Sequence, residues 1–368
     1  MTPRMTRLAL GIAAPVLALV AAFVITSLVL LVAGDPAGEV WSTILSFPEP
    51  RNLTNIVNSA AVLYLSGLAV AVGFKMNLFN IGVDGQYRIA AFAAAVVAGE
   101  GWLPGYLNTL LAILAAVLVG AAWAGIAGVL RATRGVSEVI STIMLNFIST
   151  SLVAYMLRRV AVREEGSNII ATRPVPEGSR IPGFALSAQA GTEVYGFVFI
   201  AALCGIGYWL VLNRTRFGFD LRATGGSEGA AVASGINVKR MTVAAMLVSG
   251  GLAGLVGLPI LFGGAYSYGS TFQSGLGFAG IAIALLGRNH PVGIALGALL
   301  FAFLEEQSNP LQILVDVSPD IVKITQGIIV LTVVISYEVV RRYGLRLEQR
   351  HVAQVLDRPA DEEQEVSA

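Results

Sequence analysis

Long apolar runs alternate with shorter polar segments along the chain. Ten runs stand out, at 8–33, 53–74, 89–98, 107–130, 139–157, 195–212, 241–262, 278–286, 292–303 and 321–337. Most of them approach or exceed ~20 residues, the length at which a helix crosses the hydrocarbon layer of a membrane. Strands of a membrane β-barrel would instead alternate apolar and polar residues. The pattern therefore predicts an all-α integral membrane protein with about ten transmembrane helices, some of them short or discontinuous.

Composition supports the same class. Of 368 residues, 55% are hydrophobic and only 13% are charged, whereas an ordinary soluble chain is about 25% charged. The 41 glycines are typical of membrane helices that approach one another closely. Cys204 is the only cysteine, which excludes a disulfide within the chain, and the net charge of +1 gives no indication of nucleic-acid binding.

Basic residues predict the orientation. With the N-terminus inside, 17 of the 24 Lys and Arg residues fall on the cytoplasmic side, as the positive-inside rule requires. Both termini and the polar segment 213–240 are then cytoplasmic, and loop 158–194 is external. Five arginines in that loop oppose the rule and indicate an acidic partner. We expect one transmembrane domain over 1–340 and a cytoplasmic tail over 341–368 whose acidic end is disordered.

Segment 213–240 is polar and lies between two apolar runs, with basic residues at both ends. Ser227 is placed to cap a short helix that Gly235 would end. A short helix with small side chains, held between two spans, suits binding in a groove of a partner protein. The alternative interpretation is an ordinary cytoplasmic connection.

Two glycine-rich breaks interrupt the apolar pattern, at 73–88 and 263–280. The first carries Asn77, Asn80, Asp84 and Gln86. Irregular backbone at membrane depth survives only where protein or a water-filled cavity satisfies its polar groups. Short interrupted segments in both halves of a chain indicate a transport path between inverted repeats. A tight cytoplasmic turn is an equally good interpretation of the first break.

A third polar stretch, 135–148, places Ser141, Thr142 and Asn146 within a span and Glu138 beside it. Polar groups in membrane helices face protein or a pore rather than lipid. The stretch therefore predicts either pore lining or hydrogen bonding between helices without contact to a solute.

The sequence contains no motif typical of an ATPase or a metal site. None of Lys75, Lys239 and Lys323 follows a glycine, so the chain has no P-loop. The two histidines, His290 and His351, lack the spacing of a metal site. We expect no catalytic residues, no metal and no cofactor bound by this chain.

Three stretches together resemble the permease subunits of ABC importers for simple sugars and nucleosides: "NLFNIGVDGQYRIAAFAAA", "RGVSEVISTIMLNFI" and "RTRFGFDLRATGGSEGAAVASGINVKRM". "GRNHPVGIALGALLFAFLE" agrees with them, and the resemblance covers about 53–337. The motifs "NIGVDGQ" and "EVISTIMLN" are most similar to those of the nucleoside branch of this family. The resemblance implies a type II-like importer permease with an inverted repeat in the bacterial cytoplasmic membrane.

The resemblance also implies roles for individual residues. Segment 213–240 would contain the coupling helix that binds the ATPase subunit, in a variant pattern where Gly229 replaces the first Ala. The positions that match are Arg216, Gly218, Leu221, Arg222, Ala223, Gly225, Glu228, Ala230, Ala231 and Gly235. The candidates for lining the substrate path are Asn77, Asn80, Asp84, Gln86, Ser141 and Asn146.

The predicted function is the translocation path of an ABC importer for a nucleoside or simple sugar. Its implied partners are a second permease of different sequence, two ATPase subunits that bind ATP and Mg²⁺, an external substrate-binding lipoprotein and membrane lipid. Three alternatives remain open from the sequence: a sugar or amino-acid permease of the same architecture, an ion-coupled secondary transporter, and a membrane-embedded enzyme.

Overall fold

The computed structural model describes residues 3–162, 170–270 and 272–356. Helices form almost all of the ordered structure in these ranges, and the only β-structure there is three isolated bridges that involve loop 158–194. The chain divides into two compact units, residues 1–41 with 311–368 and residues 42–310. The prediction of an all-α fold is confirmed.

The smaller unit pairs the two ends of the chain. α1 (Pro3–Ala33) packs along α15 (Ile321–Leu356), and α14 (Leu311–Leu314) precedes the latter. The Trp41 ring lies 4.6 Å from that of Phe23, and its indole nitrogen donates to Ser27 Oγ at 2.9 Å. α15 continues well beyond the predicted span, into the basic part of the tail. The acidic end of the tail, 357–368, lies outside the described residues.

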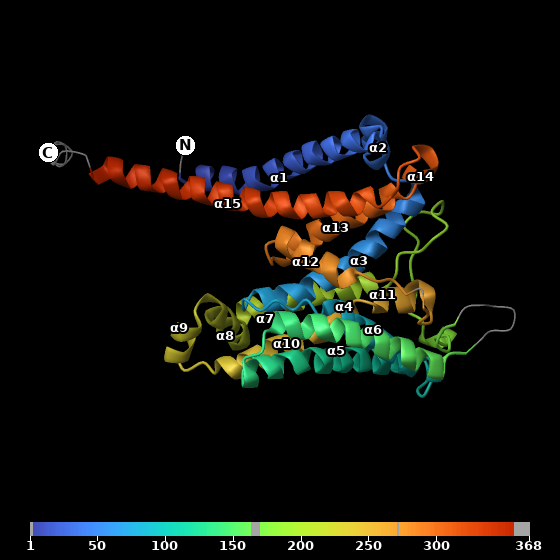
Figure 1. Ribbon diagram of the computed structural model, residues 1–368. Coiled ribbons are helices and arrows are strands. Elements are labelled where there is room, and N and C mark those ends of the chain that lie inside the picture. The colour runs from blue at the N-terminus through green and yellow to red at the C-terminus, as the bar shows by residue number, and fades with distance from the viewer. Residues whose placement is uncertain (1–2, 163–169, 271, 357–368) are drawn as a thin grey trace. The chain divides into compact units, whose positions relative to one another are not determined.

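The larger unit is built around α3 (Pro50–Phe74), the most deeply buried of its long helices. Figure 1 shows the other helices of this unit around it. In chain order they are α4 (Val83–Glu100), α5 (Tyr106–Arg134), α6 (Glu138–Val160), α7 (Phe197–Arg214), α8 (Arg216–Gly226), α9 (Glu228–Ala233), α10 (Val238–Leu255), α11 (Leu258–Ile260), the π-turn η2 (Leu261–Ala265), α12 (Leu276–Leu286) and α13 (Pro291–Ser308). α2 (Ala37–Ile44) connects the two units, and a 3-10 turn, η1 (Glu177–Ser179), lies in the long loop.

Small residues allow α5 and α10 to lie in close contact. A Cβ atom at Gly120 would overlap the carbonyl oxygen of Gly250 and lie 3.0 Å from the Gly254 Cα. Such close helix contacts are the usual reason for glycine in membrane helices. Some of the chain's many glycines thus allow this close contact between two helices.

Within the described residues, seven helices are long and apolar enough to cross a membrane: 16–33, 50–74, 106–134, 138–160, 197–214, 238–265 and 321–340. α4, α12 and α13 correspond to the three shorter predicted runs. The total is consistent with the prediction of about ten membrane helices, and these helices make the chain a multi-pass membrane protein.

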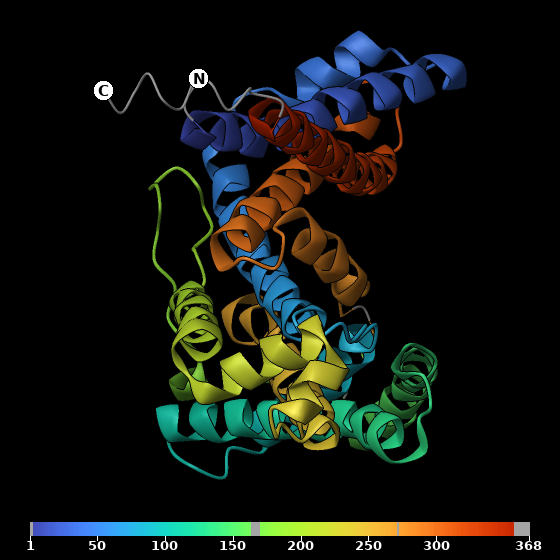
Figure 2. The ribbon, with the colours of Figure 1, turned by 90° about the vertical axis from the view of Figure 1, so that its left-hand side faces the viewer.

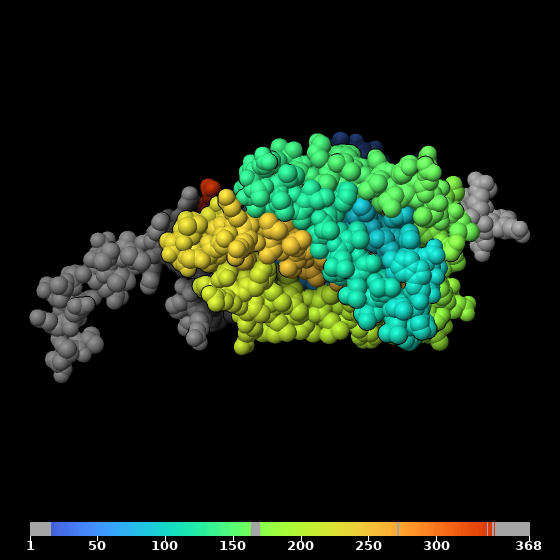
Figure 3. Space-filling model, turned by 90° about the horizontal axis from the view of Figure 1, so that it is seen from below, coloured from blue at the N-terminus to red at the C-terminus, as the bar shows by residue number. Residues whose placement is uncertain are grey.

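The polar segment 213–240 and loop 158–194 lie at opposite ends of the larger unit. Figures 1 and 3 show α8 and α9 at one end and the described part of the loop at the other. α7, one of the helices long and apolar enough to cross a membrane, leads from the loop to the polar segment.

Candidate functional site

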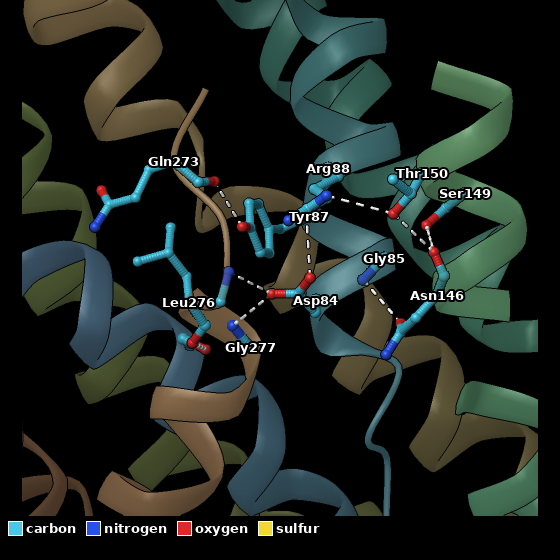
Figure 4. A network of polar contacts seen from close by, with 12 residues as sticks. Asp84, Gly85, Tyr87, Arg88, Asn146, Ser149, Thr150, Gln273, Leu276 and Gly277 are labelled. Atoms are coloured by element: carbon cyan, nitrogen blue, oxygen red, sulfur yellow. Dashed lines mark hydrogen bonds and ion pairs between the residues drawn. The ribbon is translucent and has the colours of Figure 1, made fainter. Parts of the chain in front are cut away.

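Asp84 connects the two predicted breaks of the chain. It lies in the first turn of α4, and its side chain is almost fully buried. Its Oδ1 accepts hydrogen bonds from the backbone N–H groups of Gly275 at 3.0 Å and Gly277 at 3.3 Å (Figure 4). These amides begin α12, whose first-turn N–H groups have no partner within the helix. A carboxylate from one half of the unit therefore caps a helix of the other half.

Arg88 pairs with Asp84 from one turn further along α4. Its Nε lies 3.2 Å from Asp84 Oδ2, and its Nη1 donates to Thr150 Oγ1 of α6 at 3.3 Å (Figure 4). Arg88 is one of the 17 basic residues that the positive-inside rule assigns to the cytoplasmic side, and it is not one of the predicted path residues. The i, i+4 spacing of Asp84 and Arg88 was the signal that could have identified the pair.

Asn146 joins α6 to the start of α4. Its side-chain oxygen accepts from Gly85 N at 2.8 Å, and its nitrogen donates to Ile81 O at 2.9 Å. Gly85 is required here, because a Cβ would lie 2.7 Å from that same oxygen. Ser141 is one turn and a half earlier on α6 and bonds only to Ser137 O of its own helix among the contacts described. Asn146 belongs to the network of Figure 4, whereas Ser141 lies outside it.

Asn80 and Gln86 bond to each other rather than to an open space. Both side chains are about 1% exposed. Asn80 Nδ2 donates to Gln86 Oε1 at 3.0 Å and to Ser249 Oγ of α10 at 2.8 Å, and Gln86 Nε2 donates back to Asn80 Oδ1 at 2.8 Å. Buried amides that satisfy one another this way hold helices together. Asn80 and Gln86 thus contribute a buried link between the first break and α10, and their role in lining the path stays a prediction.

Aromatic rings gather on the second break, between η2 and α12. Tyr268 and Phe272 stack with ring centroids 4.5 Å apart, and Phe92 of α4 meets Tyr268 edge-on at 5.7 Å. Tyr87 Oη donates to the Gln273 carbonyl at 2.8 Å (Figure 4). Irregular backbone, aromatic rings and the charged pair are thus neighbours.

Loop 158–194 covers this second break. Thr172 N donates to Tyr268 O at 2.9 Å, and Val175 N donates to Tyr266 O at 2.7 Å. The Arg180 guanidinium lies 4.2 Å from the centroid of the Tyr266 ring. Part of the loop's positive charge is therefore held against the chain's own second break. The predicted acidic partner of the loop remains a prediction.

Segment 213–240 forms the two short helices α8 and α9. Thr215 Oγ1 accepts from Gly218 N at 3.2 Å, and Ser227 Oγ accepts from Ala230 N at 3.3 Å. Gly235 follows α9 with a φ of +81°, the left-handed conformation that ends a helix. The short capped helix predicted at 227–235 is confirmed.

The matched coupling residues divide between the surface and the interior. Arg216, Arg222, Glu228, Ala230 and Gly235 are exposed, whereas Gly218, Leu221 and Ala231 are buried and Ala223 and Gly225 are half-buried. A segment with an anchored inner face and an exposed charged outer face has the form expected of a docking element.

The turn after α3 touches the end of α8. Asn77, exposed and at φ +55°, donates from Nδ2 to Gly225 O at 2.8 Å. A Cβ atom on Gly225 would overlap the Lys75 carbonyl and lie 2.8 Å from Met76 Cα. Burial, then the charges of Arg222 and Arg288, lower the pKa of Lys75. Asn77 therefore contacts segment 213–240, and its predicted place in the substrate path stays a prediction.

The same turn is held to α6 on its other side. Glu138 Oε1 accepts from Phe79 N at 3.4 Å, and its Oε2 lies 3.4 Å from Arg131 Nε of α5. Residues 75–82 thus connect α8 at one end to Asp84 and its partners at the other.

A family model described as "Branched-chain amino acid transport system / permease component" matches residues 52–334. The chain belongs to this permease family. A guanosine ABC transporter permease of Bacillus subtilis is 32% identical over 88% of the chain and 93% of its own length. A glucose ABC transporter permease of Haloferax volcanii is 33% identical over 84% of the chain and 82% of its length. A nucleoside ABC transporter permease of Lactococcus lactis is 29% identical over 88% of the chain and 90% of its length.

The permease is therefore the membrane component of an ABC importer, as the motifs predicted. Its relatives are transport components that work with ATPase and other ABC subunits. Of the alternatives kept open from the sequence, the family assignment favours the importer subunit over an ion-coupled secondary transporter and over an enzyme.

Proposed function

We propose that the permease forms half of a path for a neutral nucleoside and that separate ATPase subunits drive transport through segment 213–240. ATP and Mg²⁺ bind to those ATPases, because the sequence of this chain has no P-loop. A second, non-identical permease completes the path, and an external lipoprotein delivers the solute. Segment 213–240 and both termini face the cytoplasm, and the membrane is the bacterial cytoplasmic membrane.

One continuous set of contacts carries this proposal. α8 meets the turn after α3 through Gly225 and Asn77. That turn leads directly into α4, whose Asp84 caps α12 at the second break. A movement imposed on the docking helices would reach the broken segment through hydrogen-bonded backbone and rigid helix. ATP binding would shift the equilibrium between outward- and inward-facing states by acting on this connection.

The chemistry of the second break supports a neutral, partly aromatic solute. The charges of Asp84 and Arg88 compensate each other, so the network has no net charge to attract an anion or a cation. Tyr268 and Phe272 present stacked rings beside it. Aromatic faces hold planar bases by stacking, at about 1–3 kcal/mol per base in nucleic-acid complexes. Two of the three relatives named above are permeases for nucleosides or guanosine.

Uptake of labelled solutes tests the proposal. A strain that lacks this subunit is compared with the same strain carrying the wild-type gene, using labelled uridine, guanosine and ribose. We expect nucleoside entry to fall to background without the permease and to return with it, while ribose entry is unchanged. Unchanged entry of both nucleosides in the deletion strain contradicts the nucleoside assignment, and a loss of ribose entry alone indicates a sugar importer.

A further inference from the structure

A groove of about 620 Å³ lies on the larger unit, and none of its lining residues belongs to the hydrogen-bond network around Asp84. It is lined by residues of α3, α7 and α13. Both α7 and α13 pack against α3 (Figure 2). Of its lining side chains, only Tyr64, Trp209 and His290 carry a polar atom. Its other walls are alanines, valines and similar residues. Such a mostly apolar surface is suited to hydrocarbon.

The groove follows α7 from Val198 to Trp209. At 1.5 Å per residue this stretch is about 16 Å long, close to the ~15 Å of one leaflet's hydrocarbon. Ile206 and Val292 on its walls are more than half exposed, so apolar side chains line an open face. A single acyl chain fits this length and this chemistry.

The two ends of the groove differ in charge. At one end, Arg214 lies over the Trp209 ring at 5.5 Å, and His290 is exposed at the start of α13. Tyr208 Oη donates to Asn289 O at 2.9 Å and so fixes the turn before His290 against α7. A tryptophan beside a basic side chain is typical of the level of lipid headgroups.

The opposite end is acidic. Glu306, at the far end of α13, accepts hydrogen bonds from Asn55 at 3.4 Å and Ser59 at 3.3 Å, which flank the groove residue Val57 on α3. An anionic headgroup would be repelled there and attracted at the Trp209 end. The charge pattern therefore defines both the type of lipid and its direction.

We propose that the groove between α3, α7 and α13 binds an anionic phospholipid, with one acyl chain along α7 and the headgroup beside Arg214 and His290. The lipid holds α7 against α13 and fills an open apolar surface in the membrane. This site is independent of the solute: it requires only that the chain is embedded in a bilayer, which the family and the apolar helices establish.

Fluorescence quenching by brominated lipids tests the site on the full chain in nanodiscs. Trp41, Trp102 and Trp123 are replaced by Phe, which leaves Trp209 as the only reporter. Brominated phosphatidylglycerol and brominated phosphatidylcholine are compared at equal mole fraction. One basic residue near the membrane surface attracts an anionic lipid with a roughly fivefold preference. We expect stronger quenching by phosphatidylglycerol, and Arg214→Gln is expected to remove most of that difference.

Filling the groove separates this site from general attraction at the membrane surface. Ala202 lines the groove and is exposed, so Ala202→Phe should displace the acyl chain and abolish the preference. Its neighbour Leu203 is 65% exposed and does not line the groove, so Leu203→Phe is the matched control and should leave the preference intact.

Three results overturn the proposal: equal quenching by the two lipids, a phosphatidylglycerol preference that Ala202→Phe leaves unchanged, or loss of all lipid quenching of Trp209 in the assembled importer. The last result would show that a protein partner covers the groove. If a variant fails to fold, phospholipid extracted from the purified wild-type chain still decides, because the proposal expects anionic lipid enriched over the host membrane. An unenriched extract contradicts it.

Discussion

Segment 213–240 and the hydrogen-bond network around Asp84 are stabilised in opposite ways. The outer faces of α8 and α9 are exposed, and each helix begins with a local cap in which the Thr215 or Ser227 hydroxyl accepts from the N–H three residues ahead. The inner faces of the two helices are buried against neighbouring helices such as α10. Around Asp84 the hydrogen bonds are largely buried and join residues distant in sequence, as between Asp84 and Gly275. Under the proposed function, an ATPase subunit moves α8 and α9, and the network around Asp84 responds to that movement.

The largest effect is expected from breaking the buried pair. Asp84→Ala removes both the cap of α12 and the partner of Arg88. Removal of one member of a buried ion pair costs about 3–5 kcal/mol, and we expect the lower value because the Arg88 side chain is one-fifth exposed. Thermal unfolding in detergent and nucleoside uptake should both show the loss.

Two further variants divide the roles of Asp84. Asp84→Asn keeps an oxygen for Gly275 and Gly277 but leaves Arg88 unpaired, so its loss should be smaller than that of Asp84→Ala. The double variant Asp84→Ala with Arg88→Ala should be more stable than the single Asp84→Ala. Equal stability of all three variants to the wild type would mean that the pair does not hold the breaks together.

A side chain at Gly225 should disconnect the two regions. Gly225→Ala forces α8 away from Lys75 and Met76, at a cost typical of overpacking, about 1–3 kcal/mol. We expect nearly normal amounts of protein in the membrane but a severalfold loss of uptake and of its coupling to ATP hydrolysis. Gly226→Ala is the matched control, since no atom lies within 4 Å of its Cβ position. Similar uptake by the two variants contradicts the proposed connection.

The cap of the docking helix should have a smaller effect. Ser227→Ala removes the acceptor for Ala230 N and should cost about 1 kcal/mol of helix stability. Binding of the ATPase subunits, measured by co-purification at increasing salt, should weaken. Ser234→Ala, at the other end of α9, removes a hydroxyl that bonds only back to Ala230 O and should bind the ATPases as the wild type does.

The smallest effect is expected at Asn77. Asn77→Gly keeps the left-handed backbone, φ +55°, and removes one exposed hydrogen bond to Gly225 O, worth about 0.5–1 kcal/mol. Asn77→Ala also strains the backbone and should transport less than Asn77→Gly. If Asn77 instead lined the solute path, both variants would change the KM for solute rather than the maximal rate of uptake.

The short helix in segment 213–240 could be predicted from the sequence because the residues that begin and end it are close together in the chain. A serine, a short run of small residues and a glycine specify α9 within nine positions, and the structure contains that helix. The glycine-rich breaks were also visible, because they interrupt otherwise regular apolar runs. The short helices α12 and α13 followed from the same pattern.

The partners within the buried network could not be predicted in this way. Asp84 bonds to residues more than 190 positions away, and no pattern within α4 specifies Gly275 or Gly277. Arg88 was assigned to the cytoplasmic side because a basic residue beside an apolar run usually lies there. The sequence also contains no sign that Asn80 bonds to Gln86 and to Ser249 of α10. The residue types show that this region is polar. Which side chains bond to one another depends on how the helices pack, and the sequence does not show that.

Crosslinking from the docking helix tests the central claim most directly. Cys204→Ser removes the only native thiol, and Gly229→Cys then places a single cysteine on the exposed face of α9. A maleimide photocrosslinker at this position should capture an ATPase subunit in transport-competent membranes, whereas the same reagent at Ser187→Cys in loop 158–194 should not. The account is contradicted if position 229 captures no ATPase while uptake persists, or if an impermeant maleimide labels it from outside intact cells.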